Sequence, residues 1–263
     1  MSTYQADLDH ALQLADEADG ITKKYYRSSN LQIKNKPDNT PVTQADLEVE
    51  QRLRTIVVNQ FKEHYLGEEG AREGVGGRMW IVDPIDGTKN FIRSMPLWGT
   101  LIALNDGDET VAAAVSSPAL GRRWWAAKGL GAWTRDVDGS VRRVHTTAVE
   151  IVADAFLLCA TPLQPWDKTP SSEQAVQDLL ASAWRWRAPG DMINYMWVAE
   201  GAADACFEPY AKQWDIEAPK LIITEAGGSF WTNATAKTPA NAERIIIATN
   251  GPLADPIRSA LHL

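Results

Sequence analysis

Histidine and cysteine are scarce in this 263-residue chain, which has four residues of the first type and two of the second. Cys159 and Cys206 each lie in an apolar context (FLLCA and DACFE), so we expect two buried free thiols rather than a disulfide or a thiolate metal site. The scarcity argues against zinc and fits a reducing cytoplasm. It also leaves the acidic motifs of the chain without a neighbouring histidine to act as a general base.

Long apolar runs and an excess of basic residues are also missing. No run approaches the roughly 18 apolar residues of a membrane span. Residues 1–19 show no basic flank followed by an apolar stretch, so we expect neither a membrane segment nor an export signal. The formal net charge of -8 opposes nucleic-acid binding, which depends on Lys and Arg neutralising phosphates. If the ligand is itself a small phosphate compound, bound divalent cations are the simplest way to reverse the local charge.

The rest of the composition is ordinary for a globular protein, with 44% hydrophobic and 23% charged residues. We expect one domain over residues 1–263, with a subdomain seam near residue 145 and no internal repeat. Apolar residues at three- and four-residue steps predict helices over 5–28, 43–61, 171–183, 191–200, 214–226 and 252–261. Short β-favouring runs predict strands near 79–83, 97–105, 110–118, 122–128, 154–161, 184–188, 203–208, 228–231 and 244–249. This mixture favours layered α and β elements.

The most informative segment is MWIVDPIDGTKNF, residues 79–91, where an apolar strand ends at Asp83 and a tight turn returns Asp86 to the same side. Gly87 permits the backbone to come close to a ligand. If Thr88 opens a helix, the amides of Gly87 and Thr88 form a phosphate cradle. Oxygen ligands of this kind suit Mg²⁺ or Mn²⁺. The segment therefore predicts that a cation and a phosphate bind side by side.

Two further acidic positions lie at the ends of predicted elements. The run YLG (65–67) predicts a strand that delivers Glu68 and Glu69 into a loop. Asp215 stands at the start of a predicted helix, whose dipole we expect to hold its carboxylate ionised. Taken singly, each has a plain structural interpretation as a turn former, a solvated pair or a helix cap. Their conjunction with Asp83 and Asp86 favours a multi-metal carboxylate site.

The chain resembles the inositol monophosphatase family, whose members carry, in this order, a Gly-Glu-Glu element, an Asp-Pro-Ile/Leu-Asp-Gly-Thr element and a Trp-Asp element. Here these are GEE at 67–69, DPIDGT at 83–88 and WD at 214–215. The resemblance spans nearly the whole chain, although the loop after GEE differs locally. It implies an α+β fold, a layered α-β-α-β-α sandwich of the inositol monophosphatase or fructose-1,6-bisphosphatase type, and commonly a homodimer.

The same resemblance implies an activity and a role for individual residues. The activity is hydrolysis of a small phosphate monoester by a metal-activated water, with no covalent phosphoenzyme. Two or three Mg²⁺ ions, or Mn²⁺ in their place, would be held by the carboxylates of Glu68, Asp83, Asp86 and Asp215 and by the carbonyl of Ile85. The implied catalytic residues are Glu68, Thr88, which would orient the water, and Asp46 in VTQAD, which would hydrogen-bond near Thr88. The implied contacts to the substrate phosphate come from Asp86, Gly87, Thr88 and Asp215.

The pocket for the leaving group decides which ester is cleaved. Glu208 matches a substrate-contacting acidic position of the family, whereas Asp191, followed by Asn194, stands where a small or polar residue is expected. Two carboxylates favour a cationic alcohol, and the chain also resembles the histidinol-phosphate phosphatase branch of the family. We therefore expect hydrolysis of L-histidinol phosphate in histidine biosynthesis. Inositol-1-phosphate is the alternative substrate, a catalytically silent metal- or phosphate-binding protein is the alternative class, and Asp191 has a second interpretation as a helix cap.

Tryptophan is abundant, with 11 residues. Trp124, Trp125 and Trp133 lie in strand-like runs, and the alternation of Trp184 and Trp186 predicts that both point to one face of a strand. Such side chains more often form a core or a subunit interface than a stacking platform for a ligand. We therefore expect packing roles for these five residues.

Overall fold

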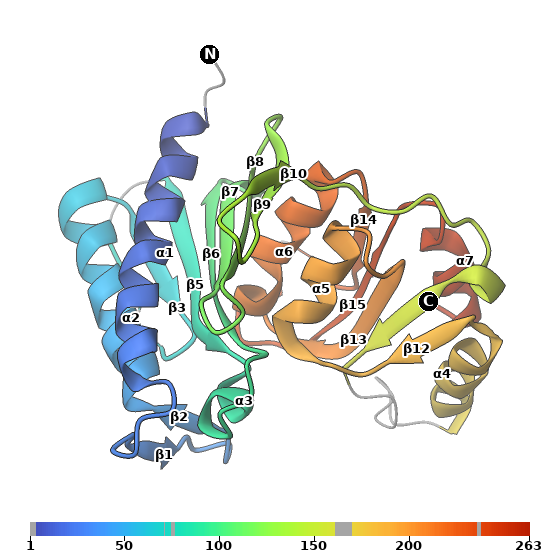
Figure 1. Cartoon of the computed structure of the whole chain (residues 1–263), viewed down its shortest axis with the longest axis horizontal. Coiled ribbons are helices and arrows are strands. Elements are labelled where there is room, and N and C mark those ends of the chain that lie inside the picture. Colours follow the sequence, from blue (N-terminus) through green and yellow to red (C-terminus); the bar gives the residue numbers. More distant parts are fainter. Residues whose placement is uncertain (1–3, 71, 75–76, 161–169, 236–237) are drawn as a thin grey trace.

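The structure is a computed structural model that describes residues 4–70, 72–74, 77–160, 170–235 and 238–263. Five layers are stacked across the molecule (Figure 1). Helices α1 and α2 cover the outer face of an eight-stranded sheet, α5 and α6 lie between that sheet and a five-stranded sheet, and α4 and α7 cover the far face of the smaller sheet. This order confirms the layered α-β-α-β-α fold. The helices are α1 (Gln5–Tyr25), α2 (Gln44–Ile56), α3 (Thr88–Ile92), α4 (Pro170–Ser182), α5 (Asp191–Ala199), α6 (Gln213–Glu225) and α7 (Ala254–Ala260).

The larger sheet has the strand order β10-β9-β8-β7-β6-β5-β3-β4, and within it only the β3–β5 pair is parallel. Parallel neighbours end at the same edge of a sheet, so the residues that follow β3 come to lie beside the end of β5. Those two ends carry the Gly-Glu-Glu and Asp-Pro-Ile-Asp elements. The strands are β3 (His64–Gly67), β4 (Arg72–Glu73), β5 (Arg78–Asp86), β6 (Gly99–Asp106), β7 (Glu109–Ser117), β8 (Arg122–Ala127), β9 (Gly131–Arg135) and β10 (Val141–Arg143).

The smaller sheet has the order β12-β11-β13-β15-β14. In it β11 lies parallel to both of its neighbours, and β15 is antiparallel to β13 and to β14. A separate ribbon of β1 (Ile33–Asn35) and β2 (Pro41–Thr43) precedes α2. The strands of the smaller sheet are β11 (Phe156–Cys159), β12 (Arg185–Arg187), β13 (Ala205–Ala211), β14 (Ser229–Thr232) and β15 (Arg244–Thr249).

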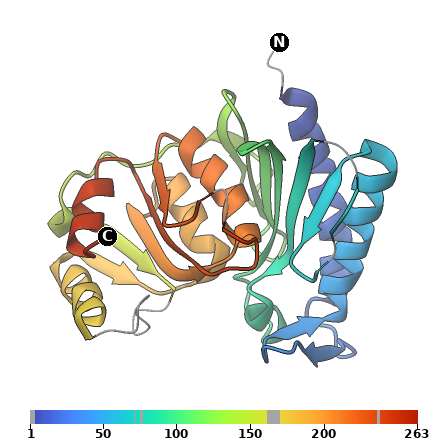
Figure 2. The same cartoon turned by 180° about the vertical axis from the view of Figure 1, so that it is seen from behind.

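Helices α5 and α6 share a buried cluster with both sheets. This cluster includes Trp124 of the larger sheet, Met196 of α5, Ile222 of α6 and Ile246 of the smaller sheet, each fully buried. A second cluster fills the space between the larger sheet and the α1–α2 pair, which covers the outer face of that sheet in both views (Figure 2). Burial of this apolar area is the main favourable term that holds the layers together. The expectation of one domain with a seam near residue 145 stays a prediction.

Helix boundaries follow the predicted ones with two differences. The first helix ends at Tyr25 rather than near residue 28, because Tyr26 adopts an extended conformation. The second is α-helical only to Ile56 and continues as a π-helical turn over Val57–Phe61. Thr43 caps this second helix, since its hydroxyl accepts hydrogen bonds from the amides two and three residues on. A regular 3.6-residue pattern predicts the axis of a helix better than its last turn.

The two cysteines are buried and free, as predicted. Trp124 is a core residue, but Trp184 and Trp186 are 69% and 40% exposed, so the core interpretation is wrong for these two within this chain. Edge strand β12, which carries Trp186, has no other strand on its outer side among the described residues. A role at a subunit interface stays a prediction. None of the described helices combines the length and the apolar character needed to cross a membrane.

Candidate metal centre

Strand β5 supplies two of the acidic side chains. Its residues are buried from Trp80 to Ile85, and the pairing with β6 shifts register between Asp83 and Asp86. At this irregularity Asp83 Oδ1 accepts a hydrogen bond from the Ile85 amide at 3.0 Å, so the carboxylate itself fixes the turn. The irregularity turns both aspartates toward the same space. Asp83 and Asp86 therefore converge at the end of an apolar strand, as predicted.

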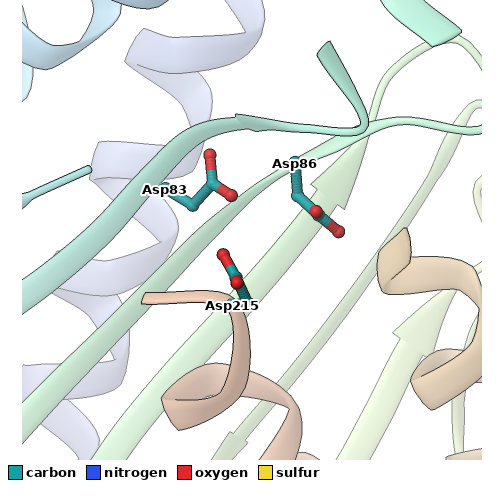
Figure 3. Close-up of side chains that lie close together, drawn as sticks. All are labelled: Asp83, Asp86 and Asp215. Atoms are coloured by element: carbon teal, nitrogen blue, oxygen red, sulfur yellow. The ribbon is translucent and has the colours of Figure 1, made fainter. Parts of the chain in front are cut away.

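Asp215 completes the cluster from the other side. It lies in the first turn of α6, where its carboxylate accepts a hydrogen bond from the Lys212 amide at 2.7 Å. One carboxylate oxygen from each of Asp83, Asp86 and Asp215 lies within 4.8 Å of the others. The three side chains point into a common space between the end of β5 and the start of α6 (Figure 3). Asp215, more than 120 positions after Asp83 and Asp86, thus joins them in one group that can hold a metal ion.

Burial and mutual repulsion disfavour the ionised form of these carboxylates. Burial is the largest effect for Asp83 and Asp86, and the neighbouring carboxylates raise each pKa further, well above the ordinary range. Burial raises the pKa of Asp215 to about 8, although the Lys212 amide opposes this. The expectation that the helix dipole holds Asp215 ionised is therefore wrong for the chain by itself, because desolvation outweighs a dipole effect of about 0.3–1 kcal/mol.

The donor set fits hard divalent cations. All three clustered groups are carboxylates, of which Asp83 is buried and Asp86 and Asp215 are partly buried, so water screens their repulsion only in part. A cation among them would remove the penalty that raises their pKa values. Mg²⁺ and Mn²⁺ take oxygen ligands of this kind, whereas zinc sites usually include nitrogen or sulfur. The cluster is thus an acidic site able to hold a metal ion.

Glu68 lies beside this cluster but outside the group of three. Its amide donates to the Val82 carbonyl at 3.1 Å, which ties the loop after β3 to β5. Its carboxylate is held by Lys36, whose Nζ lies 2.8 Å from Glu68 and 2.7 Å from Glu69. Burial raises the pKa of Glu69 to about 7, while burial of Lys36 is outweighed by the two carboxylates, which raise its pKa. Lys36 therefore places a positive charge against one of the predicted ligands.

Asp46 and Thr88 meet as predicted. Thr88 Oγ1 lies 3.5 Å from Asp46 Oδ1 and 3.0 Å from the Ile85 carbonyl oxygen. The other oxygen of Asp46 accepts from the backbone and hydroxyl of Thr43, so the helix cap also fixes the carboxylate that faces Thr88. Burial raises the pKa of Asp46 to about 6. Thr88 opens α3 as expected, with Gly87 as the residue before it at φ 83°, a conformation that favours glycine.

Asp191 lies against the same turn. The N-cap of α5 is Gly190, with no side-chain cap bond, so the interpretation of Asp191 as the helix cap is wrong. Its Oδ2 instead accepts a hydrogen bond from the side-chain amide of Asn90 at 2.7 Å. The same oxygen would lie 3.2 Å from a Cβ placed on Gly87. Burial raises the pKa of Asp191 to about 6, and the positive charge of Lys89 opposes the shift. The carboxylate of Asp191 therefore borders the predicted phosphate cradle.

Glu208 approaches the cluster from the smaller sheet. It lies on β13, where the hydroxyl of the fully buried Tyr195 donates to Glu208 Oε2 at 2.6 Å. Burial raises the pKa of Glu208 to about 7, and the charge of Asp191 acts in the same direction. Asn194, the neighbour of Tyr195 on α5, is 1% exposed, and its Oδ1 has no hydrogen-bond partner among the described residues. Glu208 also raises the pKa of Asp86, so the two carboxyl groups sense each other's charge.

The sequence model of the inositol monophosphatase family matches residues 4–262. The chain belongs to the inositol monophosphatase family. It is 42% identical to a histidinol-phosphatase from Mycobacterium tuberculosis, with 97% of this chain and 98% of that protein covered, and 39% identical to one from Streptomyces coelicolor, with 100% and 99% covered. An inositol monophosphatase from Zymomonas mobilis has a TM-score of 0.83 at 29% identity, with each chain fully covered.

Within this inositol monophosphatase fold, three supporting residues were not predicted from the sequence. Lys36 is one of several polar residues in the loop KNKPDNTPVTQAD, and nothing in that loop distinguishes it. Asn90 and Tyr195 contact the predicted carboxylates Asp191 and Glu208. Asn90 alone offered a faint signal, because it lies two residues after Thr88 in the same segment.

Proposed function

We propose that this chain hydrolyses L-histidinol phosphate to L-histidinol and inorganic phosphate, with Mg²⁺ as its cofactor. The observation that carries this proposal is the pair of carboxylates, Asp191 and Glu208, that borders the acidic cluster, since both raise the pKa of Asp86. Histidinol bears an ammonium and an imidazole, so a partly desolvated pocket with two carboxylates favours it over an uncharged alcohol. The similarity to two histidinol-phosphatases supports the same choice.

The proposed ligands of the ions are the carboxylates of Glu68, Asp83, Asp86 and Asp215 and the carbonyl of Ile85. When bound, Mg²⁺ ions acidify the attacking water and neutralise charge on the phosphate and the leaving oxygen. Side chains and amides of the protein position the water and the substrate. No covalent intermediate is needed, because phosphoryl transfer depends mainly on positioning and charge neutralisation.

Thr88 positions the attacking water. Its hydroxyl donates its one proton to Asp46 or to the Ile85 carbonyl, which lie 3.5 Å and 3.0 Å away. A lone pair of the same hydroxyl then accepts a proton of the water, which directs the water oxygen toward phosphorus. The amides of Gly87 and Thr88 donate to phosphate oxygens, and Asp191 and Glu208 hold the cationic alcohol. We further propose a homodimer in the cytoplasm.

The deciding experiment compares kcat/KM for four esters with Mg²⁺ present: L-histidinol phosphate, inositol-1-phosphate, fructose-1,6-bisphosphate and a 3′,5′-nucleotide bisphosphate. We expect a strong preference for histidinol phosphate. Preference for inositol-1-phosphate would keep the metal site and refute the acidic leaving-group pocket. Absence of phosphate release from every ester would favour a silent metal- or phosphate-binding protein.

A further inference from the structure

Asp191 has an unusual backbone conformation for a residue with a side chain. It is the first residue of α5, yet its φ angle is 53°, in the left-handed region, and it follows Gly190 at φ 82°. Aspartate tolerates this region better than most residues, but the conformation persists only where the surroundings hold it. One contact that holds it lies at the next residue, because the amide of Met192 donates to Asp86 Oδ2. The other lies at the carboxylate of Asp191 itself.

The contact at the carboxylate comes from Asn90, in the middle of α3. The side-chain Nδ2 of Asn90 donates to Asp191 Oδ2 at 2.7 Å and to the Leu97 carbonyl oxygen at 2.8 Å. An amide nitrogen of this kind has two protons, so both are used. Because the Leu97 carbonyl can only accept, the nitrogen end of the amide must face this side. The orientation of Asn90 is therefore fixed.

The same two oxygens lie against the turn that carries the predicted phosphate amides. A Cβ placed on Gly87 would lie 2.9 Å from the Leu97 carbonyl oxygen and 3.2 Å from Asp191 Oδ2. Both oxygens thus border the position that glycine leaves empty. Two acceptors so close to each other repel, and the shared donor on Asn90 offsets this repulsion.

Other charges also act on Asp191. Its charge raises the pKa of both Asp86 and Glu208, so the three carboxyl groups repel one another when ionised. Lys89 supplies the opposing positive charge, but its side chain is exposed, so water and salt screen it. Asn90 makes the direct contact. Without it, Asp191 can turn away from the pocket, which relieves both the repulsion and the left-handed backbone.

We propose that Asn90 is a positioning residue that sets the selectivity for a cationic alcohol, because it holds the carboxylate of Asp191 in the leaving-group pocket. This role rests on the proposed hydrolysis of histidinol phosphate, since a charged alcohol depends on the placement of Asp191 and a phosphate group does not. The two hydrogen bonds of the Asn90 nitrogen go to Leu97 and Asp191, not to the carboxylate cluster. Selectivity therefore depends on Asn90, and metal binding does not.

The first test compares Asn90→Ala with the unaltered chain in the presence of Mg²⁺. It measures kcat and KM for L-histidinol phosphate and the inhibition constant of inorganic phosphate, which has no alcohol part. We expect KM to rise roughly tenfold, as for the loss of one hydrogen bond to a charged group, with kcat and the inhibition constant each changed less than about twofold. A fall in kcat with KM unchanged, or an equal weakening of phosphate, would show that Asn90 only supports the turn at Gly87 and would overturn the proposal.

A double-mutant cycle provides the second test. Asp191→Asn removes the charge that Asn90 positions, so adding Asn90→Ala to it should raise KM less than about twofold further. Independent, additive effects of the two substitutions would overturn the proposal. If Asn90→Ala does not fold, Asn90→Ser takes its place in both tests, because serine keeps a polar side chain but is too short to bridge the two oxygens.

Asn250→Ala is the matched control. The side-chain amide of Asn250 also donates twice, to Thr147 Oγ1 at 3.0 Å and to the Val149 carbonyl at 2.8 Å. Asn250 follows the end of β15 that pairs with Ala205, at the opposite end of the β13–β15 pair from Glu208. Its substitution should lower the stability of the fold and leave KM and the inhibition constant unchanged.

The proposed function and this role of Asn90 fail in different ways. An unaltered chain without preference for histidinol phosphate over the other esters would refute the proposed function, and this role with it. A preference that persists in full in Asn90→Ala would refute the role alone.

Discussion

At the scale of single residues, Asp86 connects two parts of the site. It belongs to the carboxylate cluster, and its Oδ2 accepts the Met192 amide at the start of α5. Asp86→Asn keeps the volume and the acceptor but removes the charge that a cation needs. We expect kcat to fall by at least about 10²–10³, comparable to the loss of one transition-state contact, with the fold retained. Phosphate release and circular dichroism measure the two effects.

The matched control for that substitution is Asp255→Asn, because the Asp255 side chain is 96% exposed. It should leave kcat unchanged. Full activity of Asp86→Asn with a normal dependence on Mg²⁺ would exclude Asp86 as a ligand.

Tyr195 holds Glu208 in place. Tyr195→Phe removes the hydroxyl that donates to this carboxylate at 2.6 Å and adds no bulk. Hydrogen bonds to charged groups contribute about 1.5–3 kcal/mol, so we expect KM for histidinol phosphate to rise by roughly tenfold while KM for an ester of an uncharged alcohol changes less. Tyr26→Phe is the control, because its hydroxyl donates only to the Ser94 carbonyl near the surface. Equal changes in KM for both esters would show that Tyr195 only stabilises the fold.

Glu208 makes the stability of the metal-free chain depend on pH. Burial raises its pKa from 4.5 to about 7, so folding favours the protonated form. Its contribution to stability is complete below about pH 4.5 and is lost as the pH rises through about 7. We expect the free energy of unfolding to fall less between pH 5 and pH 8 in Glu208→Gln than in the unaltered chain, as measured by urea titration with a chelator present. Exposed Glu150→Gln should behave like the unaltered chain.

At the scale of elements, the start of α2 links helix stability to the site. Thr43 caps this helix and also donates to Asp46, which faces Thr88. We expect Thr43→Ala to lower the free energy of unfolding by about 1–2 kcal/mol and to lower kcat as well. Thr55→Ala is the matched control on the same helix, because the Thr55 hydroxyl donates to the Gln51 carbonyl of its own helix. Urea unfolding and turnover together separate the two effects, and an unchanged kcat would remove Asp46 from the proposed mechanism.

Local patterns predicted what depends on neighbours in the sequence. The turn from Asp83 to Asp86 and the cap at Thr43 follow from residues a few positions apart, and both are present. The partners Lys36–Glu68 and Asn90–Asp191 are 32 and 101 positions apart, so only the packing of layers brings them together. The raised pKa of Asp215 has the same origin, because its burial depends on strands that the pattern of its own helix does not reveal. The family resemblance supplied part of this information, because it implied roles for Asp46 and Glu208.

At the scale of the whole molecule, a metal ion should stabilise the fold. The clustered carboxylates come from β5 and α6 and repel one another in the metal-free chain. We expect Mg²⁺ at about 100 times its Kd to raise the free energy of unfolding by about 2.7 kcal/mol. Thermal unfolding with Mg²⁺ and with chelator measures this. Asp86→Asn should lose the effect and Asp255→Asn should keep it, whereas an equal rise in all three would mean that Mg²⁺ acts elsewhere.

The position of α6 between the two sheets also has a consequence during synthesis of the chain. Glu68, Asp83 and Asp86 leave the ribosome early, with the strands of the larger sheet, whereas Asp215 follows only after most of the smaller sheet has been made. A growing chain that has finished the larger sheet therefore exposes an incomplete set of acidic groups and cannot yet hold the ion in its final place. We therefore expect hydrolysis to begin only after α6 has docked.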